Sequence, residues 1–247
     1  MSFWTAHHAR TIDPQRFRAH DQYLEQADHY PYESICLYLK EIGAWEWVLK
    51  CGEDGAYGCV TRNVHGVTVS RDLLDSVLEI HYLRTALGNA WFSEPKIVLD
   101  IGAGYGRLVH RMYQLFPRIF MFATDEIPVS LDVARTYLKS RGLADWVLER
   151  PLIGNARFNL AINVHSWSEC TLDEISTWLE MLARLNVPRL FIVPHTPDMG
   201  SWAPGVKPGE GPSYRELLAQ HGYLVESHWS GPPCNPRRYY LFARVPR

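Results

Sequence analysis

Residues 97–107, Ile-Val-Leu-Asp-Ile-Gly-Ala-Gly-Tyr-Gly-Arg, are the segment that decides the fold. The apolar run predicts a buried strand. The three glycines at alternate positions predict a sharp turn whose backbone comes close to a ligand, because glycine has no Cβ. We expect a helix to begin near Tyr105 and to direct its free N–H groups at that ligand. The segment therefore predicts a nucleotide-cofactor site between a strand and a helix.

The spacing of these glycines separates the site from the dinucleotide-binding fingerprint. That fingerprint needs its third glycine one place later, where this chain has Arg107. It also does not usually carry an acidic residue in the strand just before the first glycine, where this chain has Asp100. The pattern indicates another class of nucleotide cofactor.

A second apolar run, residues 119–125, ends in Asp125 roughly 20 residues beyond the glycines, where Rossmann-like folds bind a ribose diol. Two carboxylate oxygens suit two vicinal hydroxyls. The alternative is that Asp125 caps a helix that begins at Pro128, since Asp is a common N-cap residue and proline a common first helical residue.

The residues from Val98 to Gly106 resemble motif I of the class I S-adenosylmethionine-dependent methyltransferases. The resemblance implies S-adenosylmethionine as the cofactor. It also implies an α/β fold with a Rossmann-like sheet of seven strands, the last one antiparallel, and helices on both faces. The residues expected to bind the cofactor are Asp100, Gly102, Ala103, Gly104, Tyr105, Gly106, Asp125, Glu126, Asn163 and Val164.

Composition agrees with a globular enzyme, because 47% of the 247 residues are hydrophobic and 21% are charged. The formal charge is -2 and no Lys/Arg cluster is present, which argues against nucleic acid and favours a small-molecule acceptor.

No segment is long enough to cross a membrane and residues 1–8 lack a leader pattern, so we expect no membrane association and a cytoplasmic location. The five cysteines contain no Cys-x-x-Cys pair, which argues against a disulfide framework and a structural zinc.

Alternating strand and helix patterns from residue 97 onward predict a parallel sheet covered by helices. The last two strands, around the Gly231–Pro236 turn, predict an antiparallel hairpin at the end of the sheet. Two Ser/Thr-x-x-Glu patterns, at Thr171 and Ser213, predict capping boxes at helix starts. We expect residues 96–247 to form the cofactor-binding domain.

The first 95 residues are expected to form an acceptor-binding lid. They include a predicted helix at residues 34–49, a predicted hairpin within residues 52–69 and an amphipathic helix at residues 72–83. N-terminal additions of this kind commonly cover the acceptor in the methyltransferases that the chain resembles.

The loops that follow the fourth and fifth strands carry the residues expected to select and activate the acceptor. Residues 163–170, Asn-Val-His-Ser-Trp-Ser-Glu-Cys, resemble a signature of sugar O-methyltransferases, from which Trp167 and Cys170 depart. The second loop holds His195 between Pro194 and Pro197, followed by Asp198.

Transfer of a methyl group to a hydroxyl needs a base within hydrogen-bond reach, because the hydroxyl pKa lies far above neutrality. His195, His165 and Glu169 are the candidates. Asp198 is expected either to orient His195 or to join a metal site. A divalent cation such as Mg²⁺ stays an alternative, although Glu169, Asp198 and Asp173 are scattered in the sequence.

Aromatic residues in loops suit the apolar faces of a sugar, and they suit a phenolic acceptor equally well. The residues expected to bind the acceptor are Trp167, Trp202, Tyr30 and Asp198. We predict an O-methyltransferase of a small molecule, with a sugar as the first choice of acceptor and a phenolic or other natural-product hydroxyl as the second. A non-catalytic subunit that binds S-adenosylmethionine is the remaining alternative, and a homodimer stays open.

Overall fold

The computed structural model describes residues 15–18, 29–149, 153–154 and 156–245. Residues 1–8, on which the leader expectation was based, lie outside this range. The strands of the described chain are β1 (Arg62–Val64), β2 (Val67–Val69), β3 (Lys96–Ile101), β4 (Ile119–Thr124), β5 (Leu160–Val164), β6 (Arg189–Val193), β7 (Tyr223–Ser230) and β8 (Arg238–Arg244). The α-helices are α3 (Tyr32–Glu41), α4 (Trp45–Cys51), α5 (Arg71–Leu87), α6 (Asn89–Ser93), α7 (Arg107–Leu115), α8 (Pro128–Ser140), α9 (Leu172–Arg184) and α10 (Arg215–Gln220).

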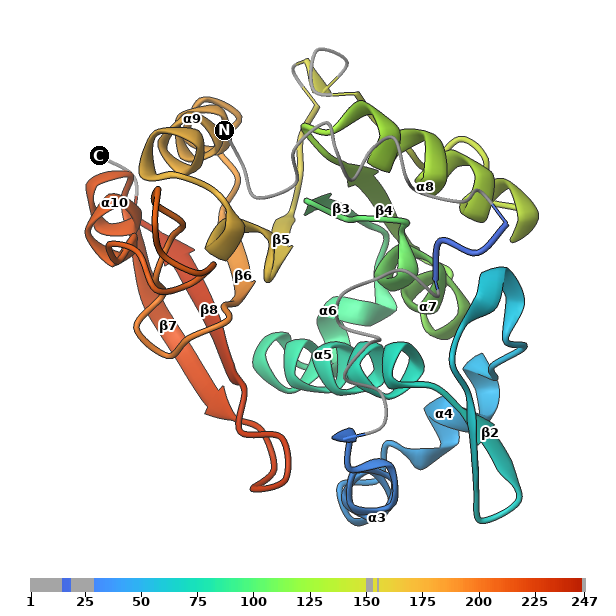
Figure 1. Cartoon of the computed structure of the whole chain (residues 1–247). Helices are drawn as coiled ribbons and strands as arrows, with labels where there is room; N and C mark the ends of the chain where they lie inside the picture. The colour runs from blue at the N-terminus through green and yellow to red at the C-terminus, as the bar shows by residue number, and fades with distance from the viewer. Residues whose placement is uncertain (1–14, 19–28, 150–152, 155, 246–247) are drawn as a thin grey trace.

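The main sheet has six strands in the order β4-β3-β5-β6-β8-β7 (Figure 1). The strands β3, β4, β5 and β6 pair in parallel, and β8 runs antiparallel to both β6 and β7. This confirms the predicted Rossmann-like α/β fold with an antiparallel last strand. The predicted strand count of seven is not met within the described residues. Next to β4 there is only a single parallel bridge between Ala123 and Val147.

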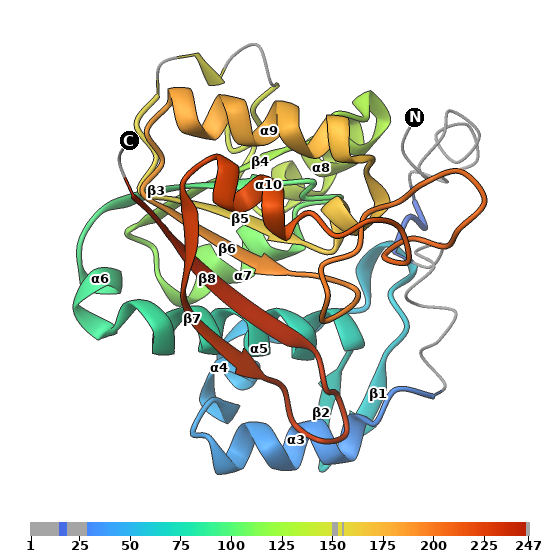
Figure 2. The same cartoon turned by 90° about the vertical axis from the view of Figure 1, so that its left-hand side faces the viewer.

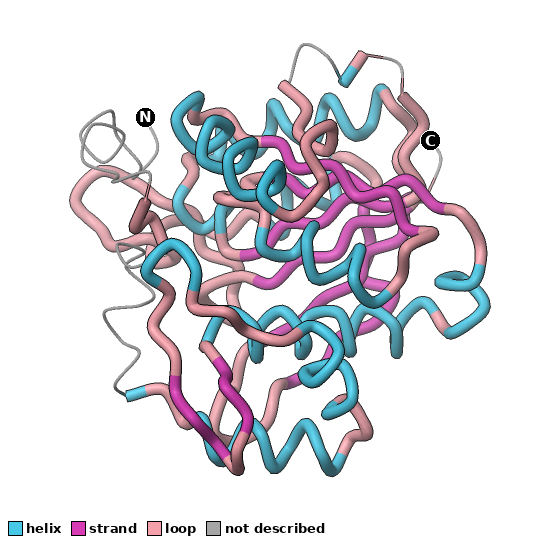
Figure 3. Tube along the Cα trace, turned by 90° about the vertical axis from the view of Figure 1, so that its right-hand side faces the viewer, coloured by secondary structure: helices cyan, strands magenta, loops and turns pink. Residues whose placement is uncertain are grey.

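Helices cover both faces of this sheet, as predicted. Figure 2 shows α9 and α10 on one side of the strands and α5 on the other. Alternate residues of one strand therefore enter different cores. Val98 packs with α5 and α7, whereas its neighbour Leu99 packs with α9 and α10. Figure 3 shows the helices flanking the sheet, with the β1–β2 hairpin apart from it.

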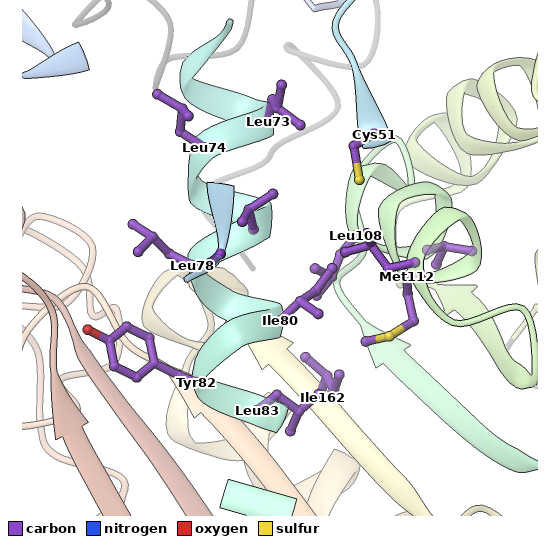
Figure 4. Packing of buried hydrophobic residues seen from close by; sticks show 14 of the residues in the cluster. Cys51, Leu73, Leu74, Leu78, Ile80, Tyr82, Leu83, Leu108, Met112 and Ile162 are labelled. Carbon is purple, nitrogen blue, oxygen red and sulfur yellow. The ribbon is translucent and has the colours of Figure 1, made fainter. Parts of the chain in front are cut away.

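Helix α5 is the element that joins the N-terminal region to the sheet. Its start is capped by Ser70, whose side chain accepts a hydrogen bond from the backbone N–H of Leu73. Its apolar side faces α7, where Ile80 lies beside Leu108 and Met112 (Figure 4). The same helix contacts β8, so residues of α5 reach the carboxyl edge of the parallel strands.

Three local predictions need correction or support. The helix expected at residues 34–49 is two helices, because Gly43 adopts a φ of +71° between α3 and α4. The capping box at Thr171 is present, with both hydrogen bonds formed. The one expected at Ser213 is absent, because the Ser213 hydroxyl donates to the carbonyl of Asp198 and Tyr214 caps α10 without a side-chain bond.

Candidate functional site

The glycine turn lies where predicted, between β3 and α7. Gly102, Gly104 and Gly106 adopt φ values of +69°, +55° and +85°, a region that favours glycine. The backbone N–H groups of Gly102 and Ala103 both donate to the carbonyl of Thr124, at 2.9 and 3.2 Å. These bonds fix the turn beside the end of β4.

The three glycines of the turn have different surroundings. A Cβ at Gly102 would lie 2.0 Å from Ser166 Oγ, and one at Gly106 would lie 3.0 Å from Leu138. Both positions therefore serve packing within the chain. A Cβ at Gly104 would meet nothing within 4 Å, so the space in front of Gly104 is open to a ligand.

A small pocket of about 40 Å³ lies beside this turn. Its lining residues are Asp100, Gly102, Ala103, Arg107, Leu108 and Val164. Burial raises the pKa of Asp100 to about 8, although the charge of Arg107 acts in the opposite direction. The pocket therefore contains a carboxyl group whose ionised form is disfavoured by burial.

Arg107 is a residue of this pocket that the sequence reading did not assign. Its guanidinium holds the Glu79 carboxylate of α5 through two hydrogen bonds of 2.8 Å, and it donates to Ser76 at 2.8 Å. Fork-to-fork pairing of this kind fixes geometry as well as charge. The only sequence signal was its place directly after the glycine turn.

Asp125 follows β4 directly, as predicted. Its carboxylate accepts hydrogen bonds from Ile127 N at 3.0 Å and from Ser130 Oγ at 2.8 Å. Burial raises its pKa. The N-cap of α8 is Ile127, without a side-chain cap hydrogen bond, so Asp125 lies before the cap and is not the N-cap itself. The ribose role of Asp125 stays a prediction. Glu126, which was expected beside it, is exposed.

At the end of β5, the side chain of Asn163 forms hydrogen bonds with other parts of the chain. Its Nδ2 donates to the carbonyl of Ile101 at 2.9 Å and to Ser166 Oγ at 2.5 Å, and its Oδ1 accepts from Trp167 N at 3.2 Å. The side chain thus connects β3 to the 3-10 helix η4 (Ser166–Glu169). Its expected neighbour Val164 lines the pocket.

The three candidate bases come together beyond the ends of β5 and β6. The ring centroids of His165 and His195 are 4.9 Å apart, and Glu169 Oε1 lies 3.9 Å from His195 Nε2. His165 holds a φ of +67°, an uncommon value for a residue with a side chain. The backbone N–H of His195 donates to Ser168 Oγ at 3.1 Å, which ties the two loops together.

Both histidines are held in the neutral form. Burial is the main cause that lowers the pKa of His195 to about 4, with Arg237 next, while a hydrogen bond to the backbone of Pro208 acts in the opposite direction. Burial also lowers the pKa of His165, followed by the charges of Arg237 and the neighbouring His195 ring. A neutral imidazole is the form that can accept a proton.

The predicted acceptor residues have different outcomes. Trp167, expected to bind the acceptor, is fully buried and meets Tyr214 edge to face in the core under α10. The η4 turn points it inward. Asp198 is exposed and its carbonyl accepts from Ser213, whereas the carboxylate recorded beside His195 is that of Glu169. Trp202 is half-buried, and Tyr30 donates its hydroxyl to Asp75 at 2.7 Å.

One set of close potential metal ligands occurs among the residues that the structure describes: Glu53, Cys59 and Asp72. The guanidinium of Arg18 lies between its carboxylates, with Nη2 at 2.8 Å from Glu53 and 2.7 Å from Asp72. Asp72 also binds the hydroxyl of Tyr105. The positive charge of Arg18 therefore already balances the carboxylates of Glu53 and Asp72, where a metal ion would otherwise bind.

No protein-family model and no curated protein matches the sequence. Solved structures with a similar arrangement include an O-methyltransferase family protein from Burkholderia thailandensis, at 14% identity and a TM-score of 0.49 over 70% of this chain and 58% of that one. An S-adenosylmethionine-dependent methyltransferase from Aquifex aeolicus has 20% identity and a TM-score of 0.47, over 66% and 93%. The M1A22 tRNA methyltransferase of B. subtilis has 12% identity and a TM-score of 0.48, over 66% and 65%.

The sequence identities and TM-scores of these matches are low, so the matches assign no activity to this chain. Within the described residues, no helix has both the length and the apolar character needed to span a bilayer. All five cysteines are free thiols.

Proposed function

We propose that this protein is an S-adenosylmethionine-dependent O-methyltransferase that acts on a hydroxyl group of a small molecule. The observation that carries the proposal is the position of two features at one edge of the sheet. The open glycine turn follows β3, and the cluster of His165, His195 and Glu169 follows β5 and β6. Ligands bind at this edge in open α/β sheets.

The residues around the turn fit the cofactor. The space in front of Gly104 admits a ligand next to the backbone, and the N-terminus of α7 begins directly beyond it. Asp100 suits the cationic amino group of the methionine end, because a cation favours the ionised form of a buried carboxyl group. We propose Asp125 for the ribose hydroxyls. When bound, S-adenosylmethionine supplies an electrophilic methyl group on a sulfonium.

Besides the cofactor, methyl transfer to a hydroxyl requires a base, and the cluster of His165, His195 and Glu169 supplies the candidates. As the bond between the acceptor oxygen and the methyl carbon forms and the sulfur–methyl bond breaks, the hydroxyl proton must pass to a base. Neutral His195 accepts it in our proposal, and the nearby Glu169 stabilises the imidazolium that results. His165 is the alternative base, and Glu169 itself is the third.

A sugar is our first choice of acceptor, on the resemblance of residues 163–170 to the sugar O-methyltransferase signature and on the half-buried Trp202. A phenolic hydroxyl is the second choice. The small net charge and the lack of a Lys/Arg cluster in the sequence favour either over nucleic acid. We also propose that residues 1–95 contribute to acceptor binding, because α5 and Tyr30 bring charged and aromatic groups to the same edge.

Calorimetry tests the cofactor half of the proposal. The protein is titrated with S-adenosylmethionine and with S-adenosylhomocysteine, and the Asp125→Ala variant is expected to lose roughly 1–3 kcal/mol of binding free energy from stranded ribose hydrogen bonds. Asp145→Ala is the matched control, since Asp145 is exposed. No binding by the unaltered protein overturns the proposal, and unchanged affinity in Asp125→Ala overturns the ribose assignment.

A transfer assay tests the chemical half. Methyl-labelled cofactor is incubated with sugars and with phenols, in the presence and absence of a chelator. Label in a sugar ether supports the first choice, and label in a phenol ether supports the second. Loss of transfer on chelation assigns a role to a divalent cation. Cofactor binding without transfer to any acceptor favours the non-catalytic alternative.

A further inference from the structure

The first residues of β8 lie beside the histidine cluster because β8 runs antiparallel to β6. Ile192 pairs with Tyr240, so Tyr239 stands opposite the end of β6 and His195 follows shortly after. Arg237 and Asn235 belong to the turn that precedes β8. Residues from the end of the chain thus come to the same sheet edge as the glycine turn.

Arg237 is fixed at this edge by carboxylates of α5. Its Nη1 lies 2.9 Å from Asp75 Oδ2 and 4.0 Å from Glu79 Oε1. Asp75 also accepts from Tyr30 and from Asn235, which holds the β7–β8 turn against α5. The guanidinium is therefore positioned before any acceptor binds, which reduces the entropy lost on binding.

The charge of Arg237 acts on both histidines, where it lowers the pKa of each. Arg71 of α5 acts in the same direction on both rings. Arg107 does so on His165. Glu169 faces His195 from the η4 side, and the two rings face one another. Arginine side chains from three elements therefore act on the rings, while Asp75 and Glu79 pair with Arg237 itself.

Tyr239 adds an unused donor at this place. Its side chain is fully buried and stacks on Tyr82 of α5 with ring centroids 4.3 Å apart. Its hydroxyl has no hydrogen-bond partner among the described residues, although Arg237, Asp75 and Glu79 are near enough to act on its pKa. Burial raises that pKa, so the group stays protonated. A buried hydroxyl without a partner is unfavourable, and an acceptor oxygen of a ligand would satisfy it.

We propose that Arg237 and Tyr239 form a subsite for an anionic oxygen group of the acceptor, a carboxylate or a phosphate, next to the hydroxyl that is methylated. The inference rests on the proposed function and narrows its acceptor to acidic small molecules. Guanidinium and phenol hydroxyl both donate, which suits an oxyanion and not an ammonium. Binding there holds the neighbouring hydroxyl against the histidines and removes part of the entropic barrier.

Binding experiments test the subsite without relying on turnover. Glucuronate, glucose 6-phosphate and methyl glucoside are compared by ligand-observed NMR on the full chain, with and without S-adenosylhomocysteine. We expect one of the two anionic sugars to bind at least tenfold more tightly than methyl glucoside. A preference for glucuronate assigns a carboxylate, and a preference for glucose 6-phosphate assigns a phosphate.

Variants locate the site. Tyr239→Phe removes only the hydroxyl, and Arg237→Lys keeps the positive charge but not the forked pair of donors. Each variant is expected to bind the anionic sugar at least fivefold more weakly. The affinity for methyl glucoside should not change. Tyr214→Phe is the matched control, since Tyr214 is a buried tyrosine in the core on the α10 side of the sheet. Thermal unfolding of each variant checks that it folds.

Equal binding of all three sugars, or anion binding that Tyr239→Phe leaves unaltered, overturns the subsite. Calorimetry with S-adenosylhomocysteine distinguishes failure of the subsite from failure of the proposed function. A protein that binds the cofactor product but shows no anion preference keeps the proposed function and loses the subsite. A protein that binds no cofactor loses the proposed function, whatever its anion preference.

Discussion

The carboxylate of Glu169 lies 3.9 Å from the ring of His195, measured from Oε1 to Nε2. The pair joins residues from the loops after two neighbouring strands, β5 and β6. Because burial and Arg237 lower the pKa of His195 to about 4, the ring is neutral at pH 7. An imidazole next to a carboxylate is suited to take up a proton and to be stabilised once it is charged.

The first prediction concerns His195 as the base. His195→Ala is expected to lower turnover by roughly 10²–10⁴-fold while the affinity for S-adenosylmethionine stays nearly unchanged. In the unaltered protein, turnover should persist as the pH falls below 6 and should then decline with a midpoint of about 4, because protonation of His195 removes the base. Steady-state rates from pH 4 to pH 8 measure this limb, which should vanish in the variant.

His165→Ala and Glu169→Gln are the comparisons for this prediction. If both histidine variants keep near wild-type turnover and Glu169→Gln abolishes it, the base is a carboxylate and the histidine assignment is wrong.

The second prediction concerns two glycines of the same turn. Gly102→Ala is expected to lower the free energy of unfolding by about 2–4 kcal/mol, because its Cβ would overlap Ser166 and φ is positive. Gly104→Ala should lose only about 1–2 kcal/mol, from φ alone, yet it should weaken cofactor binding, because its Cβ enters the open space. Urea unfolding and calorimetry measure the two effects.

The double variant Gly102→Ala, Ser166→Gly is the check on that mechanism. It removes the side chain that the new Cβ would meet, so it should recover part of the lost stability. No recovery would mean that the overlap is not the cause.

The third prediction is a pH dependence of stability from Asp100. Its pKa is raised by burial from 3.8 to about 8 in the folded protein, so the folded state binds more protons than the unfolded state between these values. The contribution of Asp100 to stability is therefore complete below its unfolded pKa and is lost as the pH rises through 8. The slope is at most about 1.4 kcal/mol per pH unit for one proton.

Asp100→Asn isolates this contribution. The interval from pH 6.5 to pH 8 is the informative one, because both histidines are neutral there in the folded protein. The free energy of unfolding of the unaltered protein should fall relative to that of the variant across this interval. Parallel curves for the two proteins would show that Asp100 is already ionised.

The fourth prediction concerns the ion pair between Arg107 and Glu79. Arg107→Met is expected to destabilise the fold by about 3–5 kcal/mol, because it removes both hydrogen bonds to the buried Glu79 carboxylate and leaves the guanidinium of Arg237 only at 4.0 Å. Burial raises the pKa of Glu79, so the loss should be smaller at pH 5 than at pH 8. Denaturant unfolding at both pH values measures this.

Arg135→Met is the matched control for Arg107→Met. Arg135 forms exposed ion pairs with Asp132 and Glu149, and their loss should change stability by no more than about 1 kcal/mol. Equal losses for the two variants would mean that burial of the Arg107 pair has little effect.

The sequence by itself determined the features that depend on neighbouring residues. The strand, glycine turn and helix at residues 96–115 form where the pattern predicted them, and the capping box at Thr171 forms as its spacing predicted. The convergence of His165 and His195 was also predictable, because the carboxyl ends of parallel strands meet at one edge.

Only the tertiary structure decided which side chains face that edge. Trp167 shares a loop with His165, yet the η4 turn buries it in the opposite core, a direction that spacing alone does not give. The contacts of Arg107 with Glu79 and of Asn235 with Asp75 span 28 and 160 residues of sequence. Such contacts depend on how α5 packs against the sheet, and packing of distant surfaces leaves no periodic signal in the chain.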